Sequence, residues 1–268
     1  MIKVGIIGVG TIGSVLARTC LDEFKEDVRL VGVMDIHAQR EKQVMKELGL
    51  KRQYDLHSLI QKSDLIIEAA GKAIAYPITK HALSLGKDVM VMSTGGLVHK
   101  EKEIYELAST HRCCVYLPSG AICGIDGLKS AGVGKLKGVS LTTRKAPLGF
   151  KNAPYILKKK IDLNAISEDT LLFEGSAEKA IEAFPQNINV SATLSLAGLG
   201  PKKTRVRIYA CPGIQHHIHE VSVEGEFGTF FTRTQNKPAK QNPKTSQLAV
   251  YSAIATLRRI LQNVKIGT

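Results

Sequence analysis

The chain has 268 residues, of which 44% are hydrophobic and 23% charged, ordinary values for a globular protein with one large or two modest domains. Its net charge of +13 is spread along the chain, aromatic residues make up 5% and tryptophan is absent, which argues against a groove for single-stranded nucleic acid. No apolar run reaches the about 18 residues of a membrane helix, and residues 1–15 lack a signal-peptide pattern. We therefore expect a cytoplasmic protein with neither a nucleic-acid nor a membrane partner.

Residues 1–15 combine an apolar strand pattern with a glycine-rich turn. The strand covers 2–7, the turn at 8–13 has the spacing G-x-G-x-x-G, and a helical pattern follows over 11–24. In this motif the glycines permit a tight turn, close approach of a pyrophosphate to the backbone, and close packing of helix on strand. The start of the helix adds free N–H groups and the positive end of its dipole. The predicted cofactor-binding residues here are Gly8, Gly10, Thr11 and Ile12.

A second buried strand over 28–34 ends in Asp35, roughly 20 residues after the glycines, where a carboxylate accepts from the ribose hydroxyls of a dinucleotide. A carboxylate there disfavours the 2′-phosphate of NADP. No arginine that could bind this phosphate follows Asp35 before Arg40. The predicted cofactor is NAD, with NADP as the alternative.

Strands and helices alternate through the rest of the first half. We expect strands over 64–70, 88–92 and 113–117, and helices over 38–48, 55–60, 73–85 and 99–110. This alternation predicts a Rossmann-type, doubly wound parallel sheet in a dinucleotide-binding domain of residues 1–118. Ligands of such sheets bind beyond the carboxyl ends of the strands, where Ala70 and Gly71 would lie near the nicotinamide.

The pattern changes after Pro118. We expect helices over 122–131, 155–160, 176–183 and 187–199, and strand-like alternation over 138–144, 204–210, 215–223 and 227–234. These segments predict an α+β domain with a mainly antiparallel sheet over 119–243, which would hold the substrate and pair two subunits. A polar loop over 236–243 leads to an amphipathic helix over 245–261, and the segment 244–268 is predicted to pack back on the first domain.

Two segments of the second half suit catalysis. In the strand around 215–224, His217 and His219 would share a face with Val221, and imidazoles suit proton transfer near neutral pH. A metal site would need a third ligand, and packed core histidines are the structural alternative.

Before the last helix, free N–H groups would make an anion site, with plain helix capping as the alternative. The predicted substrate-binding residues are Ser119, Lys244, Thr245 and Ser246.

The five cysteines are scattered without C-x-x-C spacing, which predicts neither a disulfide framework nor a zinc site and favours a reducing compartment. A nucleophilic Cys123 would suit an aldehyde-oxidising dehydrogenase, but no histidine lies near it in sequence. We expect Cys123 to be a small buried residue.

Taken together, five segments resemble the L-aspartate dehydrogenases over nearly the whole chain; they cover 8–13, 118–126, 184–193, 219–225 and 242–246. The resemblance implies oxidation of L-aspartate by a nicotinamide cofactor to iminoaspartate, and then oxaloacetate and ammonia; the imine can feed NAD biosynthesis. It also implies a homodimer, a catalytic role for His219, and cofactor contacts at Ala121 and Asn189.

Three alternatives stay open at this point. One is an imine reductase of the dihydrodipicolinate type, whose substrate is also a dicarboxylic imine, and another is a semialdehyde dehydrogenase that uses Cys123. The third is a non-enzymatic regulator that senses the dinucleotide. A sensor needs no proton-transfer group, so a histidine pair facing a pocket favours an enzyme.

Overall fold

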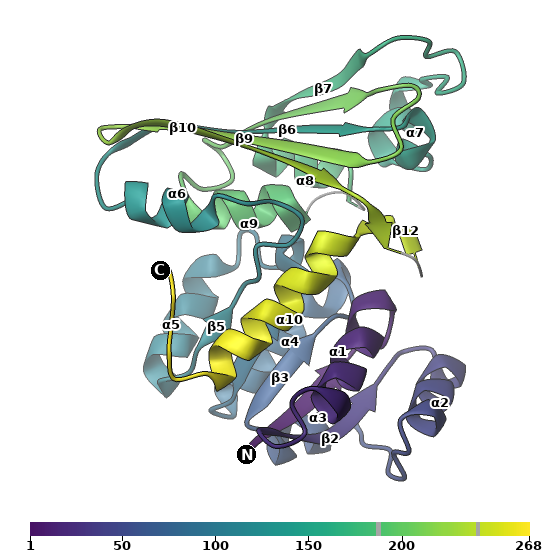
Figure 1. The fold of residues 1–268 in the computed structure, drawn as a ribbon, viewed down its shortest axis with the longest axis vertical. Coiled ribbons are helices and arrows are strands. Elements are labelled where there is room, and N and C mark those ends of the chain that lie inside the picture. Colours follow the sequence, from purple (N-terminus) through teal and green to yellow (C-terminus); the bar gives the residue numbers. More distant parts are fainter. Residues whose placement is uncertain (186–188, 240–241) are drawn as a thin grey trace. The chain divides into compact units, whose positions relative to one another are not determined.

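The computed structural model describes residues 1–185, 189–239 and 242–268, with the backbone alone at 243 and 244. It divides into two compact units (Figure 1). Unit 1 comprises residues 1–118 and 253–264, and unit 2 comprises residues 119–252 and 265–268. Among the residues described, no helix is both long enough and apolar enough to cross a membrane.

Unit 1 contains a five-stranded sheet with the order β2-β1-β3-β4-β5, in which every neighbouring pair is parallel. This confirms the predicted Rossmann-type sheet. Its central strands are mostly apolar because helices cover both faces, as parallel sheets require, and their charged residues are Lys3, Glu68 and Asp88. The strands are β1 Ile2–Ile7, β2 Val28–Met34, β3 Leu65–Glu68, β4 Asp88–Val91 and β5 Val115–Tyr116.

Two apolar cores flank the sheet of unit 1. One core joins Leu16 of α1 with Leu257 of the C-terminal helix α10, and the other joins Ile78 of α4 with Ile104 of α5. The helices are α1 Thr11–Asp22, α2 Ala38–Glu47, α3 Leu56–Lys62, α4 Lys72–Ser84, η1 Thr94–Gly96, α5 Glu101–His111 and α10 Gln247–Leu261. The residues of α10 from Ala253 onward belong to this unit.

Unit 2 contains a five-stranded sheet with the order β10-β9-β6-β8-β7. The pair β6 and β8 is parallel and the other neighbours are antiparallel, so the predicted mainly antiparallel sheet is confirmed with one parallel exception. The strand β7 was not predicted, because a register shift between Leu171 and Phe173 interrupts its alternation. The strands are β6 Leu136–Lys145, β7 Thr170–Ser176, β8 Arg205–Ala210, β9 His217–Gly225 and β10 Gly228–Asn236.

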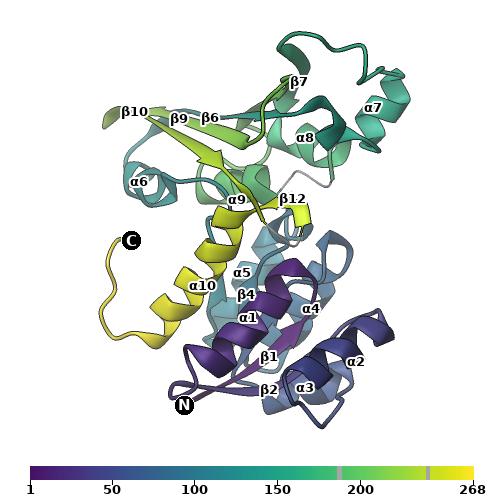
Figure 2. The same ribbon diagram turned by 45° about the vertical axis from the view of Figure 1, so that its right-hand side comes forward.

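Helices pack against one face of this sheet, as Figures 1 and 2 show for α6, α8 and α9. Ser176 caps α8 as predicted, since its hydroxyl accepts from the N–H of Lys179 at 3.3 Å. Helix α6 begins at Ile125 rather than Ile122, after Gly124 in a left-handed conformation with φ 88°. The elements are α6 Ile125–Ala131, η2 Pro147–Phe150, α7 Pro154–Lys159, α8 Ala177–Ala183 and α9 Asn189–Ala197.

The segment before α10 differs from its prediction. A short antiparallel pair, β11 Pro238–Ala239 and β12 Asn242–Ser246, lies where we expected a loop. Helix α10 consequently begins at Gln247 rather than at Thr245. Thr245 and Ser246 end this strand, and Ser246 is also the residue directly before α10, one of the two positions expected to cap the helix.

Candidate functional site

The glycine turn of unit 1 depends on two positions where a side chain would collide with backbone. Gly8 has a φ of 93°, and a Cβ there would clash with the backbone of Ala69 and Ala70. A Cβ on Gly13 would clash with the carbonyl oxygen of Gly8, so α1 can approach β1 this closely only because residue 13 is glycine.

The turn leaves room for a ligand at Gly10. Apart from Gly10 and its two chain neighbours, no residue of the described part of the chain has an atom within 4 Å of the place where a Cβ of Gly10 would be, and Gly10 immediately precedes α1. The first turn of α1 contains no acidic residue that would repel a phosphate. Open space beside a helix N-terminus without negative charge fits the pyrophosphate of a dinucleotide. The predicted contacts Gly10, Thr11 and Ile12 lie together there.

Asp35 lies at the end of β2, beside this turn. Its Oδ2 accepts from the N–H of Val9 at 2.9 Å, and its Oδ1 accepts from the N–H of His37 at 2.9 Å. The Arg40 guanidinium donates to the same Oδ2 from 3.3 Å and is half-exposed, whereas the Asp35 side chain is buried. A carboxylate has about four acceptor positions, so Asp35 keeps capacity for a ribose hydroxyl while it holds the turn against β2.

The loop after β3 is organised by Glu68, a residue that the sequence analysis missed. Its Oε1 accepts from the N–H groups of Ala70 and Gly71 at 2.8 and 3.0 Å, and its Oε2 accepts from the N–H of Ser93 at 3.0 Å. Burial raises the pKa of this carboxyl, against the effect of those bonds. Ala70 and Gly71 thus lie at the expected sheet edge, but their N–H groups are committed to Glu68. An acidic residue inside a buried strand was the available signal.

In unit 2 the structure places His219 on the inward face of β9, as the alternation predicts. Thr143 on β6 and Thr234 on β10 lie opposite His219 in the sheet. The imidazole is 3% exposed, and its Nδ1 lies 3.0 Å from Oγ1 of Thr143. Burial holds the pKa of His219 well below its ordinary value, and the charges of Lys145 and His217 lower it further. The ring is therefore neutral at pH 7.

His217 lies two residues before His219 on the same face. Its Nδ1 lies 3.2 Å from the hydroxyl of Ser246, the last residue of β12. Burial, followed by the charges of Lys145 and His216, lowers the pKa of His217 to about 4. Ser246 thus lies in the histidine cluster and also directly before α10, at the helix-cap position that was one interpretation of this segment.

Lys145, the last residue of β6, is the second residue that the sequence analysis missed. Its side chain is 7% exposed, and burial lowers the pKa of its ammonium group to about 8. The predicted strand ended at residue 144. Its alternation, continued by one residue, would have placed Lys145 on the buried face with Thr143.

The loop after Pro118 is attached to β10. The carbonyl of Ala121 accepts from the Thr234 hydroxyl at 2.9 Å and from Nδ2 of Asn236 at 3.0 Å. A Cβ on Gly120 would lie 3.9 Å from Cγ1 of Val190, which follows Asn189 in α9. The structure therefore brings the loop of Ser119 and Ala121 close to the first turn of α9.

Cys123 is exposed rather than buried, because the loop presents it to solvent while its carbonyl accepts from Thr232 at 3.2 Å. The side chain of Lys244 lies outside the described part of the chain, and Thr245 is half-buried. Within the described residues, no group of three or more histidine, cysteine, aspartate or glutamate side chains is placed to hold a metal ion.

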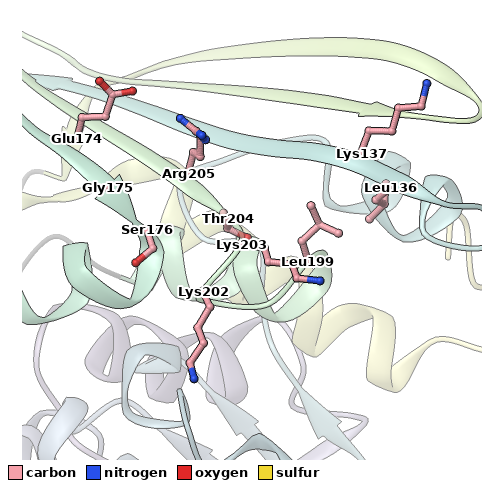
Figure 3. A pocket seen from close by; sticks show the side chains of 10 residues that line it. All are labelled: Leu136, Lys137, Glu174, Gly175, Ser176, Leu199, Lys202, Lys203, Thr204 and Arg205. Carbon is pink, nitrogen blue, oxygen red and sulfur yellow. The ribbon is translucent and has the colours of Figure 1, made fainter.

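A basic cavity of about 690 Å³ lies elsewhere in unit 2, between the start of β6 and the residues before β8 (Figure 3). Figure 3 shows that its cations do not converge, since Lys202 and Arg205 extend away from each other. Glu174 on its wall is paired with Arg207 at 2.9 Å. Neither histidine of the cluster lines this cavity, so we place no part of the reaction there.

A glycine turn with room for a pyrophosphate in unit 1 and a buried imidazole pair in unit 2 together define a dehydrogenase that uses a nicotinamide dinucleotide. The family profiles that match the two parts of the chain are consistent with this class of protein. The family profile described as "Homoserine dehydrogenase, NAD binding domain" matches residues 8–118. The profile described as "Aspartate dehydrogenase, C-terminal" matches residues 126–260.

Relatives that match this chain over their whole length identify the particular family. The L-aspartate dehydrogenases of Methanosarcina mazei and Methanosarcina barkeri are 44% and 43% identical to this chain, with 100% of each chain covered. The crystal structure of aspartate dehydrogenase from Thermotoga maritima matches with a TM-score of 0.71 and 25% identity, over 100% of both chains. The chain belongs to the L-aspartate dehydrogenase family.

Proposed function

We propose that this chain oxidises L-aspartate to iminoaspartate, which water converts to oxaloacetate and ammonia. The observation that carries the proposal is the buried, neutral His219 on the inward face of β9, in a chain whose whole-length relatives bear the name L-aspartate dehydrogenase. A neutral imidazole can accept the proton that amine oxidation releases.

Unit 1 would hold the cofactor. Gly8 shapes the turn, while Gly10, Thr11 and Ile12 face the pyrophosphate and Asp35 accepts from the ribose. When bound, the nicotinamide supplies the hydride acceptor for the substrate Cα. At the nicotinamide end we propose cofactor contacts at Ala70 and Gly71 of unit 1, and at Ala121 and Asn189 of unit 2.

His219 would take a proton from the substrate nitrogen. Its Nδ1–H can donate to Oγ1 of Thr143 at 3.0 Å, which leaves the lone pair of Nε2 as the acceptor. Once that proton has passed to solvent, Nε2 regains its lone pair and could activate the water that attacks the imine. Ser119, Lys244, Thr245 and Ser246 remain the proposed contacts of the substrate, and Ser246 already lies at His217.

The experiment is to mix the full chain with NAD or NADP and L-aspartate, and to follow the reduced cofactor by its absorbance, with L-glutamate and L-alanine as controls. We expect reduction with L-aspartate alone. No reduction with any amino acid would favour a dinucleotide sensor. Inactivation by thiol alkylation would support the Cys123 alternative, and reduction of dihydrodipicolinate-type imines would support the reductase.

Arg40 provides a test of the cofactor preference. We propose NAD as the main cofactor, with NADP accepted because the half-exposed Arg40 guanidinium beside Asp35 can pair with a 2′-phosphate. Arg40→Ala should raise KM for NADP about tenfold, as expected for one lost charge-assisted bond, and change KM for NAD far less. Steady-state kinetics measures both, and Arg18→Ala, an exposed arginine of α1 paired with Glu47, is the matched control. Equal changes for both cofactors would show that Arg40 acts only through Asp35.

We also propose that the chain forms a homodimer. Strand β10 is an edge strand of its sheet, and Phe231 on it is 63% exposed. Exposed edges and apolar side chains on them are features that proteins usually cover. Sedimentation of the full chain should give twice the chain mass, and a monomer at micromolar concentration would contradict the proposal.

A further inference from the structure

A second basic cavity lies in unit 1, at the amino end of its parallel sheet. Its volume is about 400 Å³, and five cationic side chains and one carboxylate line it. These residues are Lys3, Arg29, Arg52, Lys62, Lys87 and Asp64. No residue of the glycine turn or of the histidine cluster lines this cavity, so it is separate from the site described above.

The sheet places like charges opposite each other at this edge. Lys3 of β1 pairs directly with Arg29 of β2. On the other side of β1, the N–H of Asp64 donates to the carbonyl of Lys3 at 2.8 Å, just before β3 begins. Like charges that face each other across neighbouring strands destabilise a sheet. An anion bound between Lys3 and Arg29 would remove that cost.

Helix α3 and the loop before it supply the other cations of the cavity. Lys62 is the last residue of α3. In the loop, the Tyr54 ring packs against β2, where a Cβ on Gly32 would lie 2.8 Å from Cδ2 of Tyr54. The Arg52 guanidinium lies 5.0 Å from the centre of the same ring. Stacking on a ring orients a guanidinium and leaves the N–H groups at its edge for a ligand.

The protein itself leaves the charge of these cations uncompensated. Within the residues that the structure describes, none of the five forms an ion pair with a carboxylate. Oδ2 of Asp64 accepts from the backbone N–H of Lys3 at 2.9 Å rather than from an ammonium group. Tyr54 and Gln61, which also line the cavity, add a hydroxyl and an amide donor. The cavity therefore presents positive charge and hydrogen-bond donors.

Such a cavity suits a small polyanion. Guanidinium and ammonium groups make charge-assisted hydrogen bonds to phosphate oxygens, and several cations around one cavity favour a ligand with more than one anionic group. A volume of about 400 Å³ fits a small molecule. We propose that this cavity binds a small phosphorylated ligand that carries at least two anionic groups.

This ligand site is distinct from the proposed cofactor turn. Lys3 lies at the amino end of β1 and Gly8 follows its carboxyl end, which in strand geometry separates them by about 16 Å. A ligand in the cavity and a dinucleotide at the turn therefore do not compete for space. A ligand there acts on the reaction only from a distance, as a regulatory ligand does.

The test uses tripolyphosphate as the probe, with the full chain in excess NADH to occupy the proposed cofactor turn. Calorimetry should show one tripolyphosphate bound per chain. Arg29→Gln and Lys87→Gln should each weaken this binding at least about tenfold, as expected for one lost charge-assisted bond. The matched control is Lys102→Gln, which removes a 90% exposed lysine of α5 outside the cavity and should bind like the wild type.

A second readout separates ligand binding from an effect on the fold. Arg29→Gln removes a charge that faces Lys3, so without ligand its melting temperature should equal or exceed that of the wild type. Tripolyphosphate should raise the melting temperature of the wild type by mass action, and that of Arg29→Gln much less. If Arg29→Gln does not fold, Lys87→Gln takes its place, because Lys87 lies outside the strands.

The control and two further ligands decide between this site and its alternatives. Equal weakening in Lys102→Gln would indicate general attraction to a chain of net charge +13 and would overturn the proposal. Citrate bound as tightly as tripolyphosphate would overturn the assignment to phosphate. A single-stranded oligonucleotide that binds more tightly, and is lost in Arg29→Gln and Lys87→Gln, would overturn the choice of a small ligand. Absence of tripolyphosphate binding in the wild type would overturn the site itself.

Discussion

Replacing His219 with glutamine should lower kcat for L-aspartate oxidation by about 10²–10⁴, the usual contribution of a positioned general base. Glutamine is neutral, polar and similar in length to histidine, so we expect the sheet around Thr143 to remain folded. What the variant loses is the lone pair of Nε2 that accepts the proton. KM should change less than kcat, because the lost interaction belongs to the transition state.

Two measurements show whether the loss is chemical. NADH binding, followed by its fluorescence, should be unchanged in His219→Gln, because the proposed pyrophosphate and ribose contacts lie in unit 1. His111→Gln, which replaces an exposed histidine at the end of α5, should keep the kcat of the wild type. Turnover by His219→Gln within a few fold of the wild type would exclude His219 as the proton acceptor.

The sheet of unit 1 could be predicted because its signals are local. Apolar runs such as β2 and glycine turns such as that of residues 8–13 can be recognised from a few consecutive residues. Unit 2 was less predictable, because the parallel pairing of β6 with β8 joins segments about 65 residues apart in the chain. The register shift in β7 removed the periodicity by which a strand is recognised.

The residues of the candidate site were likewise predictable only in part. The glycine turn, Asp35 and the histidine pair were predicted from short motifs. Glu68 and Lys145 were not, because both are charged residues whose burial depends on what the tertiary fold places over them. Ionisable residues buried at strand ends are therefore where this chain departs from its local pattern, and at Glu68 the departure shapes the loop of Ala70 and Gly71.

Gly8→Ala should mainly destabilise the fold, whereas Gly10→Ala, two residues further along the chain, should mainly weaken cofactor binding. At Gly8 the φ of 93° and the clash with Ala69 and Ala70 make alanine strained, so Gly8→Ala should lower the free energy of unfolding by more than about 2 kcal/mol. At Gly10 the φ of −71° suits alanine and the space is open, so Gly10→Ala should leave that free energy within about 0.5 kcal/mol.

For cofactor binding we expect Gly10→Ala to be the more damaging of the two changes, because the open space at Gly10 is the space that a pyrophosphate needs. Gly10→Ala should weaken NADH binding at least about 100-fold, the equivalent of two charge-assisted hydrogen bonds. Fluorescence titration measures the binding and urea unfolding the stability, with Gly138→Ala, at a strand glycine of unit 2 whose Cβ would meet only ordinary contacts, as the matched control. A folded Gly10→Ala protein that binds NADH like the wild type would show that the cofactor does not approach the backbone at this turn, and the proposed contacts at Thr11 and Ile12 would fail with it.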